Sequence, residues 1–124
     1  MKAGIWMDHE SAEYIVYTNG SAMPGRNDHV VINSEYHLPL GGGDKLKHNK
    51  EQSRQGAFYR QLGELVAGLE EVLLFGPTEA KTELSNMLRR DHRFDKVAIV
   101  IRPSDKLTSN QRQAFVNEYY VNQY

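Results

Sequence analysis

A run of three glycines followed by a basic stretch is the part of this 124-residue chain best suited to chemistry with an anionic partner. The residues concerned are Gly41, Gly42 and Gly43, then Lys45, Lys47, His48, Lys50 and Arg54. Residues 44–60 hold five Lys or Arg against Asp44 and Glu51, a local charge of +3 in a chain of formal net charge −1. Glycines let a backbone approach a phosphate closely, and cations attract it regardless of base sequence. This composition is typical either of a nucleic-acid-binding loop or of a solvated basic surface loop.

Asp8 indicates a second kind of chemistry, metal-dependent cleavage of nucleic acid. Such enzymes converge several carboxylates on two metal ions. Glu13, Glu64 and Glu79 are the other candidate carboxylates, and their spacing in the sequence gives no reason to expect them to lie together. Gly76-Pro77 follows the apolar run of residues 72–75, where a further acidic residue would be needed. We therefore expect Asp8 to be a turn residue that bonds its own backbone. The sequence predicts no catalytic residue, no metal ligand and no cofactor.

Composition removes several classes of function. The chain has no cysteine, which excludes disulfide scaffolds, thiolate zinc sites and cysteine nucleophiles. No apolar stretch approaches the roughly 20 residues of a membrane span, and the first residues lack a secretory signal, so we expect a cytoplasmic protein with no membrane partner. The length suits one domain over residues 1–124.

The elements that must position the loop follow from apolar patterning. Short runs rich in β-branched and aromatic residues predict five strands. They cover residues 2–7, 12–18, 29–33, 72–75 and 97–101, the last two being expected as strands buried on both faces.

Helical spacing appears in three places. The first stripe is Phe58, Leu62, Leu65, Val66 and Leu69, and the second is Ala80, Leu84, Met87 and Leu88. We expect Pro77 to take the first position of the second helix, and Arg89, Arg90 and Arg93 to lie near its end, where positive charge suits the helix dipole. Those arginines would extend an RNA surface only if the fold brought them beside the glycine run. Thr108 and Gln111 form a capping box for a third helix carrying Ala114, Phe115 and Tyr119.

The order β-β-β-α-β-α-β-α predicts an α/β fold. Three leading strands favour an antiparallel meander, and the βαβ units that follow require parallel crossovers. We expect a five-stranded mixed sheet with helices on its faces, the ribonuclease H-like architecture.

Several segments resemble a known family. They are the glycine run, FGPTEAKTEL (75–84), IWMDHESAEYIVY (5–17) and SDKLTSNQ (104–111). Together they look like the middle domain of archaeal and eukaryotic peptide-chain release factors, and more closely like its small bacterial relatives, labelled translational machinery or host-attachment proteins. The resemblance implies a domain that enters the peptidyl-transferase centre of the ribosome, where the family's Gly-Gly-Gln motif helps water to cleave peptidyl-tRNA. Here Gly43 or Asp44 stands in place of the glutamine, and neither side chain can donate to a developing oxyanion.

These observations predict a non-enzymatic RNA- or ribosome-binding module, with ribosomal RNA or tRNA as its partner. Gly41 to Gly43 would form the tip, and the cations after it would contact phosphates. One alternative is a protein-interaction domain, with a protein partner or self-association, which the near-zero net charge favours; Tyr119, Tyr120 and Tyr124 would suit such a surface. The other alternative is a hydrolase, either a nuclease using Asp8 or a peptidyl-tRNA hydrolase without the glutamine.

Overall fold

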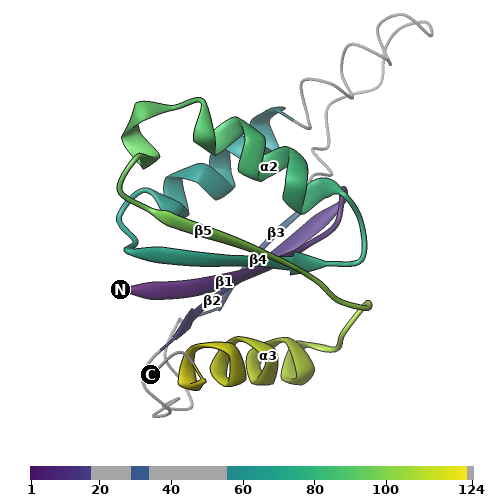
Figure 1. Ribbon diagram of the computed structural model, residues 1–124. Helices are drawn as coiled ribbons and strands as arrows, with labels where there is room; N and C mark the ends of the chain where they lie inside the picture. Colours follow the sequence, from purple (N-terminus) through teal and green to yellow (C-terminus); the bar gives the residue numbers. More distant parts are fainter. Residues whose placement is uncertain (18–28, 34–55, 123–124) are drawn as a thin grey trace, which may run out of the picture.

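The strands form one five-stranded mixed sheet, as predicted. The computed structural model describes residues 1–17, 29–33 and 56–122, and structural statements below concern these residues. The strands are β1 (Lys2–Met7), β2 (Ser11–Tyr17), β3 (His29–Asn33), β4 (Glu71–Gly76) and β5 (Ala98–Pro103). Their spatial order is β3-β2-β1-β4-β5; β2 is antiparallel to β1 and β3, whereas β4 is parallel to β1 and β5 (Figure 1).

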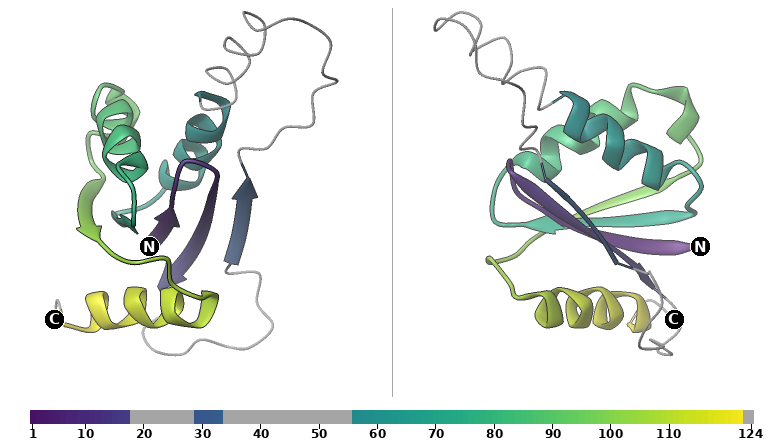
Figure 2. Two further views of the ribbon diagram at one scale, coloured as in Figure 1. Left: turned by 90° about the vertical axis from the view of Figure 1, so that its right-hand side faces the viewer. Right: turned by 180° about the vertical axis from the view of Figure 1, so that it is seen from behind.

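Helices cover both faces of this sheet. One helix spans residues 56–66, α2 spans Ala80–Arg89, the short 3-10 helix η1 spans His92–Phe94, and α3 spans Ser109–Val121. The first helix and α2 lie side by side on one face, and α3 lies alone on the other (Figure 2). This arrangement confirms a layered α/β fold. Within the described part of the chain, no helix combines the length and the apolar character needed to cross a membrane.

Two apolar cores follow from the pleat of the central strands. Alternate residues of β1 and β4 face opposite sides of the sheet, so Ile5 and Leu74 pack toward the helix pair while Trp6 and Phe75 pack toward α3. Residues 72–75 are 0% exposed, which confirms the prediction of a strand buried on both faces. The predicted stripe of the first helix is confirmed for Phe58, Leu62 and Val66, which are buried, and for Leu65, which packs against them. Leu69 is also buried, but it lies after the helix, which ends at residue 66.

The α3 side of the sheet is held by an ion pair as well as by apolar contacts. Glu13 is 3% exposed, and its carboxylate accepts from Arg112 Nη1 at 3.1 Å and from Ser109 Oγ at 2.9 Å. The Arg112 guanidinium lies 3.5 Å from the ring centroid of Trp6. The capping box of Thr108 and Gln111 is present as predicted. These contacts fix the first turns of α3 against β1 and β2.

Three expectations about these elements were wrong in detail. On α3 the fully buried residues are Val116 and Tyr120; of the residues expected there, Phe115 and Tyr119 pack against them while Ala114 is exposed. Tyr120 donates to the Ala3 carbonyl at 2.7 Å and so cannot be part of an exposed partner surface. Strand β5 is half-buried because it pairs only with β4 and forms an edge. Helix α2 begins at Ala80, because Pro77 and Thr78 belong to the turn before it.

Gly76 lies where any side chain on β4 would meet the backbone of β1, and it supplies the first prediction. Its φ of 149° is strained for any side chain, and a Cβ there would overlap the carbonyl oxygen of Met7. We expect Gly76→Ala to lower the free energy of unfolding by about 3 kcal/mol or more, measured by urea denaturation.

The matched control is Gly68→Ala, because a Cβ at residue 68 meets nothing within 4 Å. Its effect should stay within about 1 kcal/mol of wild type. Equal losses of stability in the two variants would contradict this account of Gly76.

Candidate functional site

The end of the sheet at which the parallel strands have their carboxyl termini is the place where this fold would carry a site. We call this end of the sheet the candidate edge; it is distinct from the outer strands β3 and β5. The chain leaves β1 toward β2 and leaves β4 toward β5, so its connections diverge between β1 and β4. Open α/β sheets bind ligands at such a switch point, outside the carboxyl ends of the strands. In this protein the edge is formed by the β1–β2 turn, the β4–α2 turn and the side chains that join them.

Asp8 builds the β1–β2 turn. Its Oδ1 accepts from the backbone N–H groups of Glu10 and Ser11, each at 2.8 Å, and its own N–H donates to the Ser11 carbonyl at 3.0 Å. The expectation of a turn residue bonded to its own backbone is therefore confirmed. Among residues 1–17, 29–33 and 56–122, no three histidine, aspartate or glutamate side chains are grouped so as to hold a metal ion.

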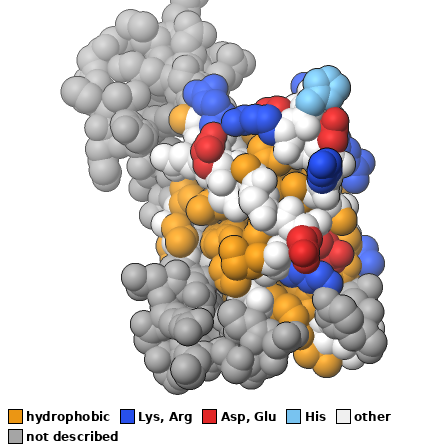
Figure 3. Space-filling view, turned by 90° about the vertical axis from the view of Figure 1, so that its left-hand side faces the viewer, with side chains coloured by type: hydrophobic (Ala, Val, Ile, Leu, Met, Phe, Trp, Pro, Cys, Tyr) orange, Lys and Arg blue, Asp and Glu red, His pale blue; other side chains and the backbone are white. Residues whose placement is uncertain are grey.

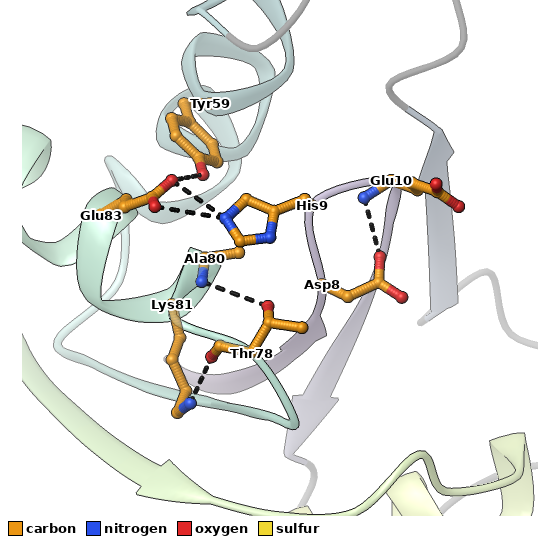
Figure 4. A network of polar contacts seen from close by, with 8 residues as sticks. All are labelled: Asp8, His9, Glu10, Tyr59, Thr78, Ala80, Lys81 and Glu83. Carbon is orange, nitrogen blue, oxygen red and sulfur yellow. Dashed lines mark hydrogen bonds and ion pairs between the residues drawn. The ribbon is translucent and has the colours of Figure 1, made fainter.

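A polar network connects this turn to two helices. Glu83 of α2 accepts from the Tyr59 hydroxyl at 2.6 Å, and both of its carboxylate oxygens lie 3.2 Å from His9 Nε2 (Figure 4). Tyr59 belongs to the helix over residues 56–66, and His9 belongs to the β1–β2 turn. We call these three residues the Glu83 cluster. It joins three separate segments of the chain at one edge.

Two of the three side chains in the Glu83 cluster are about half exposed to solvent. The side chains of His9 and Glu83 are 44% and 50% exposed, whereas Tyr59 is only 7% exposed, so an anchored ring presents its hydroxyl to a solvated carboxylate. The hydrogen bond from Tyr59 lowers the pKa of Glu83; burial opposes this shift, and His9 adds to it. The cluster therefore favours an ionised Glu83.

The β4–α2 turn beside the cluster is closed by its own side chains. Thr78 Oγ1 accepts from the Ala80 N–H at 3.2 Å, and the Lys81 ammonium donates to the Thr78 carbonyl. Lys81 is 6% exposed, so its alkyl chain is packed and its charge is turned toward the peptide oxygen of the turn (Figure 4). These bonds fix the start of α2 and hence the position of Glu83 on its first turn.

The residues predicted from the sequence to bind RNA lie outside the described residues. This applies to Gly41, Gly42, Gly43, Lys45, Lys47, His48, Lys50 and Arg54. The described residues on either side of that segment are informative. Asn33, the last residue of β3, pairs with Ser11, the first residue of β2 after the β1–β2 turn, and the helix that follows is the one that carries Tyr59. Both flanks therefore lie at the edge that holds the Glu83 cluster (Figure 2).

The three arginines lie elsewhere. Helix α2 leads away from the edge, so Arg89 in its last turn and Arg90 at its C-cap are about 15 Å from its first residue. Arg93 pairs with Asp91 at 2.9 Å and with Glu64 at 3.6 Å. The fold does not place these cations beside the flanks of the glycine-rich segment, which supports their structural role at the helix end.

Sequence reasoning missed the Glu83 cluster. Tyr59 and Glu83 are 24 residues apart, and His9 and Glu83 are 74 apart, so no local spacing relates them. The available signal was that His9 and Glu83 each follow the carboxyl end of a parallel strand, β1 and β4 respectively. No protein-family model and no curated protein matches this sequence, so the fold and this geometry carry the argument that follows.

The lowered pKa of Glu83 predicts how stability responds to acid. Because the folded-state pKa lies below the ordinary value of 4.5, the ionised carboxylate stabilises the fold above that pH, and this contribution is lost as the pH falls through the folded-state pKa. We expect Glu83→Gln to lower the free energy of unfolding by at most about 1 kcal/mol at pH 7, since the His9–Glu83 pair is half-exposed. The difference between the variant and wild type should become progressively smaller in acid. Urea denaturation across a pH series measures the difference.

Tyr59→Phe supplies the control for this prediction. Because the Tyr59 hydroxyl is the main cause of the shift, the pH-dependent cost of Glu83→Gln should shrink in the Tyr59→Phe background. If Glu83→Gln lowers the free energy of unfolding by the same amount at every pH, with and without the Tyr59 hydroxyl, the assignment of the lowered Glu83 pKa to that hydroxyl is contradicted.

Proposed function

We propose that this protein is a non-enzymatic RNA- or ribosome-binding module, similar to the middle domain of peptide-chain release factors and of ribonuclease H-like architecture. Its contact surface is the glycine-rich basic segment, in which Gly41 to Gly43 form the tip. The side chains that contact phosphates are Lys45, Lys47, His48, Lys50 and Arg54. Such a module acts in the cytoplasm, where ribosomes translate, on ribosomal RNA or tRNA.

One observation carries the proposal. The two described residues nearest the segment, Asn33 and the glycine at position 56, lie at the same edge of the sheet, at the switch point between β1 and β4. The described residues on both sides of the basic segment thus lie at the place where α/β sheets hold their ligands, which supports the proposal.

The distribution of charge supports the same surface. The whole chain carries −1 and residues 44–60 carry +3, so the remainder carries −4. RNA is repelled by the acidic remainder and attracted by the basic stretch, which orients the protein on a polyanion. A neutral total is therefore compatible with nucleic-acid binding through one segment.

The residues at the glycine run argue for binding without catalysis. In the release factors an amide follows two glycines, whereas this chain has Gly43 or Asp44 at that position. Glycine has no group to position water, and a carboxylate accepts hydrogen bonds but would repel a growing oxyanion. The proposal therefore assigns binding to the loop and no hydrolytic step.

A protein-interaction domain is the second candidate, and a different face favours it. Figure 3 shows hydrophobic side chains gathered in the middle of the face that includes the start of the chain, with charged side chains above them. Met1 is 63% exposed and Val121 is 53% exposed, near the two ends of the chain that Figure 1 marks. Exposed apolar side chains of this kind suit a protein partner.

Co-sedimentation with purified ribosomes over a salt series tests the proposed function. We expect wild-type protein to bind at low salt and to dissociate as salt rises, because each phosphate contact releases counterions. The variant Lys45→Ala, Lys47→Ala, Lys50→Ala should bind at least about tenfold more weakly and show a shallower salt slope.

The matched control is Arg89→Ala, Arg90→Ala, Lys96→Ala, which removes the same charge from exposed positions away from the candidate edge. Its affinity should stay within about twofold of wild type if the loop is the contact surface. Equal losses in both variants would mean that general charge, and not the loop, governs binding. No sedimentation of wild type at low salt would overturn the proposal in favour of a protein partner.

A further inference from the structure

We infer that the outer side of β5, which faces away from β4, is a dimer interface on which a second copy of this chain pairs its own β5 in the antiparallel direction. The composition of β5 does not match its position. Residues 97–101 are all apolar, which is typical of a strand buried on both faces, yet β5 is last in the strand order and pairs only with β4. The interface is independent of the proposed function, because β5 carries none of the residues to which that function is assigned.

The apolar side chains of β5 are covered only in part by the single chain. Ile99, Val100 and Ile101 are each half-buried, whereas residues 72–74, which pair with them on β4, are 0% exposed. Ile99 and Ile101 pack toward the helix pair and Val100 packs toward α3, so apolar surface remains on both faces. A strand added beside β5 covers more of all three side chains, and such burial drives association.

The backbone of β5 also has hydrogen-bonding groups that point outward. The Ala98 N–H donates to the Glu70 carbonyl at 2.9 Å, on the β4 side. Because successive residues of a strand direct these groups to opposite sides, the N–H and C=O groups of Ile99 and Ile101 point away from β4. Within the described part of the chain, neither of these two N–H groups has a partner.

The residues that flank this pair of donors determine the register of the dimer. The Val97 N–H is already bonded to the Phe94 carbonyl at 3.0 Å, and Pro103 has no N–H. An antiparallel pair uses both remaining donors only when Ile99 of one copy lies opposite Ile101 of the other. That register is symmetric about Val100, so a two-fold axis relates the copies and each Ile99–Ile101 pair exchanges two hydrogen bonds.

Charge complementarity favours a second copy of this chain as the occupant. In this register Arg102 of one copy lies beside Ala98 of the other, and Ala98 pairs with Glu71 on the α3 face of the sheet. The Cα atoms of Arg102 and of Glu71 in the other copy are then two strand spacings apart, about 9.6 Å, within the combined reach of their side chains. Ala98 between them is exposed and has only a methyl group. The two-fold axis forms this ion pair twice.

In the single chain, Arg102 covers an acceptor that the dimer would use. Its Nη1 donates to the Ile101 carbonyl at 3.0 Å, and its guanidinium lies 5.8 Å from the ring centroid of Tyr119. The bond is exposed to solvent, so exchanging it for another costs little. When Arg102 moves to Glu71 of the second copy, the Ile101 carbonyl becomes free for the Ile99 N–H across the axis.

The helices leave room for the second copy. Helix α2 packs on β4 as well as on β5, so its axis lies inward of the outer side of β5 (Figure 2). With paired strands about 4.8 Å apart, two α2 helices set back in this way lie side by side near the roughly 8–10 Å separation of packed helices. Because the paired β5 strands run in opposite directions, the two candidate edges lie at opposite ends of the joined sheet, and each copy keeps its own.

Sedimentation velocity of the full chain over a dilution series, combined with backbone hydrogen exchange at low and high concentration, tests this interface. We expect a reversible monomer–dimer equilibrium. The amides of Ile99 and Ile101 should be protected only at high concentration, where the dimer forms. The Ala98 amide, which is bonded to Glu70, should be protected at both concentrations.

Charge variants test the register. Arg102→Glu should raise the dissociation constant of the dimer at least about tenfold, because it places a like charge beside Glu71 in both symmetry-related contacts. Arg102→Glu combined with Glu71→Arg should recover most of the affinity, which a merely structural effect would not do. The matched control is Arg60→Glu, at an exposed position on the helix over residues 56–66, beyond α2 from β5; its dissociation constant should stay within about twofold of wild type.

A backbone variant tests the hydrogen bonds. Ile101→Pro removes an outward N–H and leaves the bonds to β4 in place, so it should raise the dissociation constant about tenfold or more. Urea denaturation in dilute solution shows whether each variant is folded, and if Ile101→Pro is not, the charge variants still decide.

Three results would overturn the inference. The first is a monomer at a concentration of about 1 mM, where even a weak dimer is populated. The second is a dimer in which the Ile99 and Ile101 amides exchange equally fast at both concentrations, because another face would then be the interface. The third is a dimer that Arg102→Glu leaves as stable as wild type.

Discussion

The structure depends on the burial of β1 on both faces. Strand β1 lies between β2 and β4 in the middle of the sheet, and helices cover both faces there. Because successive side chains of a strand point to opposite faces, those of β1 face two separate apolar layers. Gly4 leaves no side chain where Val116 of α3 approaches, and Gly76 leaves none where β4 meets Met7. With these two contacts, α3 packs closely on one face and the carboxyl ends of β1 and β4 lie together. The edge that carries the Glu83 cluster exists because of that second contact.

Two polar clusters lie on opposite sides of the sheet and have different physical characters. On the α3 side, Glu13 is nearly fully buried and held by Arg112 and Ser109, so breaking that pair would leave a buried charge. On the other side, Glu83 and His9 are half-exposed and join elements that the core already holds. The first cluster fixes a helix to the sheet, whereas the second joins the β1–β2 turn to two helices at the candidate edge.

The sequence predicts the layers well because burial imposes a local period. The hairpin around Asp8, the strand at 72–75 and the capping box at Thr108 each follow from neighbouring residues, and the structure confirms them. The errors arise where tertiary contacts decide. Arg112 interrupts the apolar spacing of α3, yet it stacks on Trp6, so the buried face was placed one position away.

Strand β5 has the apolar composition of a buried strand, but the strand order makes it an edge. No sequence period encodes that order. The two parts of the candidate site differ in the same way in how far the sequence predicts them. Its basic segment is visible in the sequence as a change of composition, whereas the Glu83 cluster requires knowledge of which strand ends meet.

Site-specific photo-crosslinking to purified ribosomes tests the central claim most directly. A photoreactive residue at position 47 would lie within the proposed contact surface, and one at position 96 would lie on the exposed surface just before β5, away from the candidate edge. The account predicts crosslinks to ribosomal RNA from position 47, mapped by reverse-transcription stops, and few or none from position 96. Crosslinks of equal yield from both positions, or crosslinks from position 47 to protein alone, would contradict it.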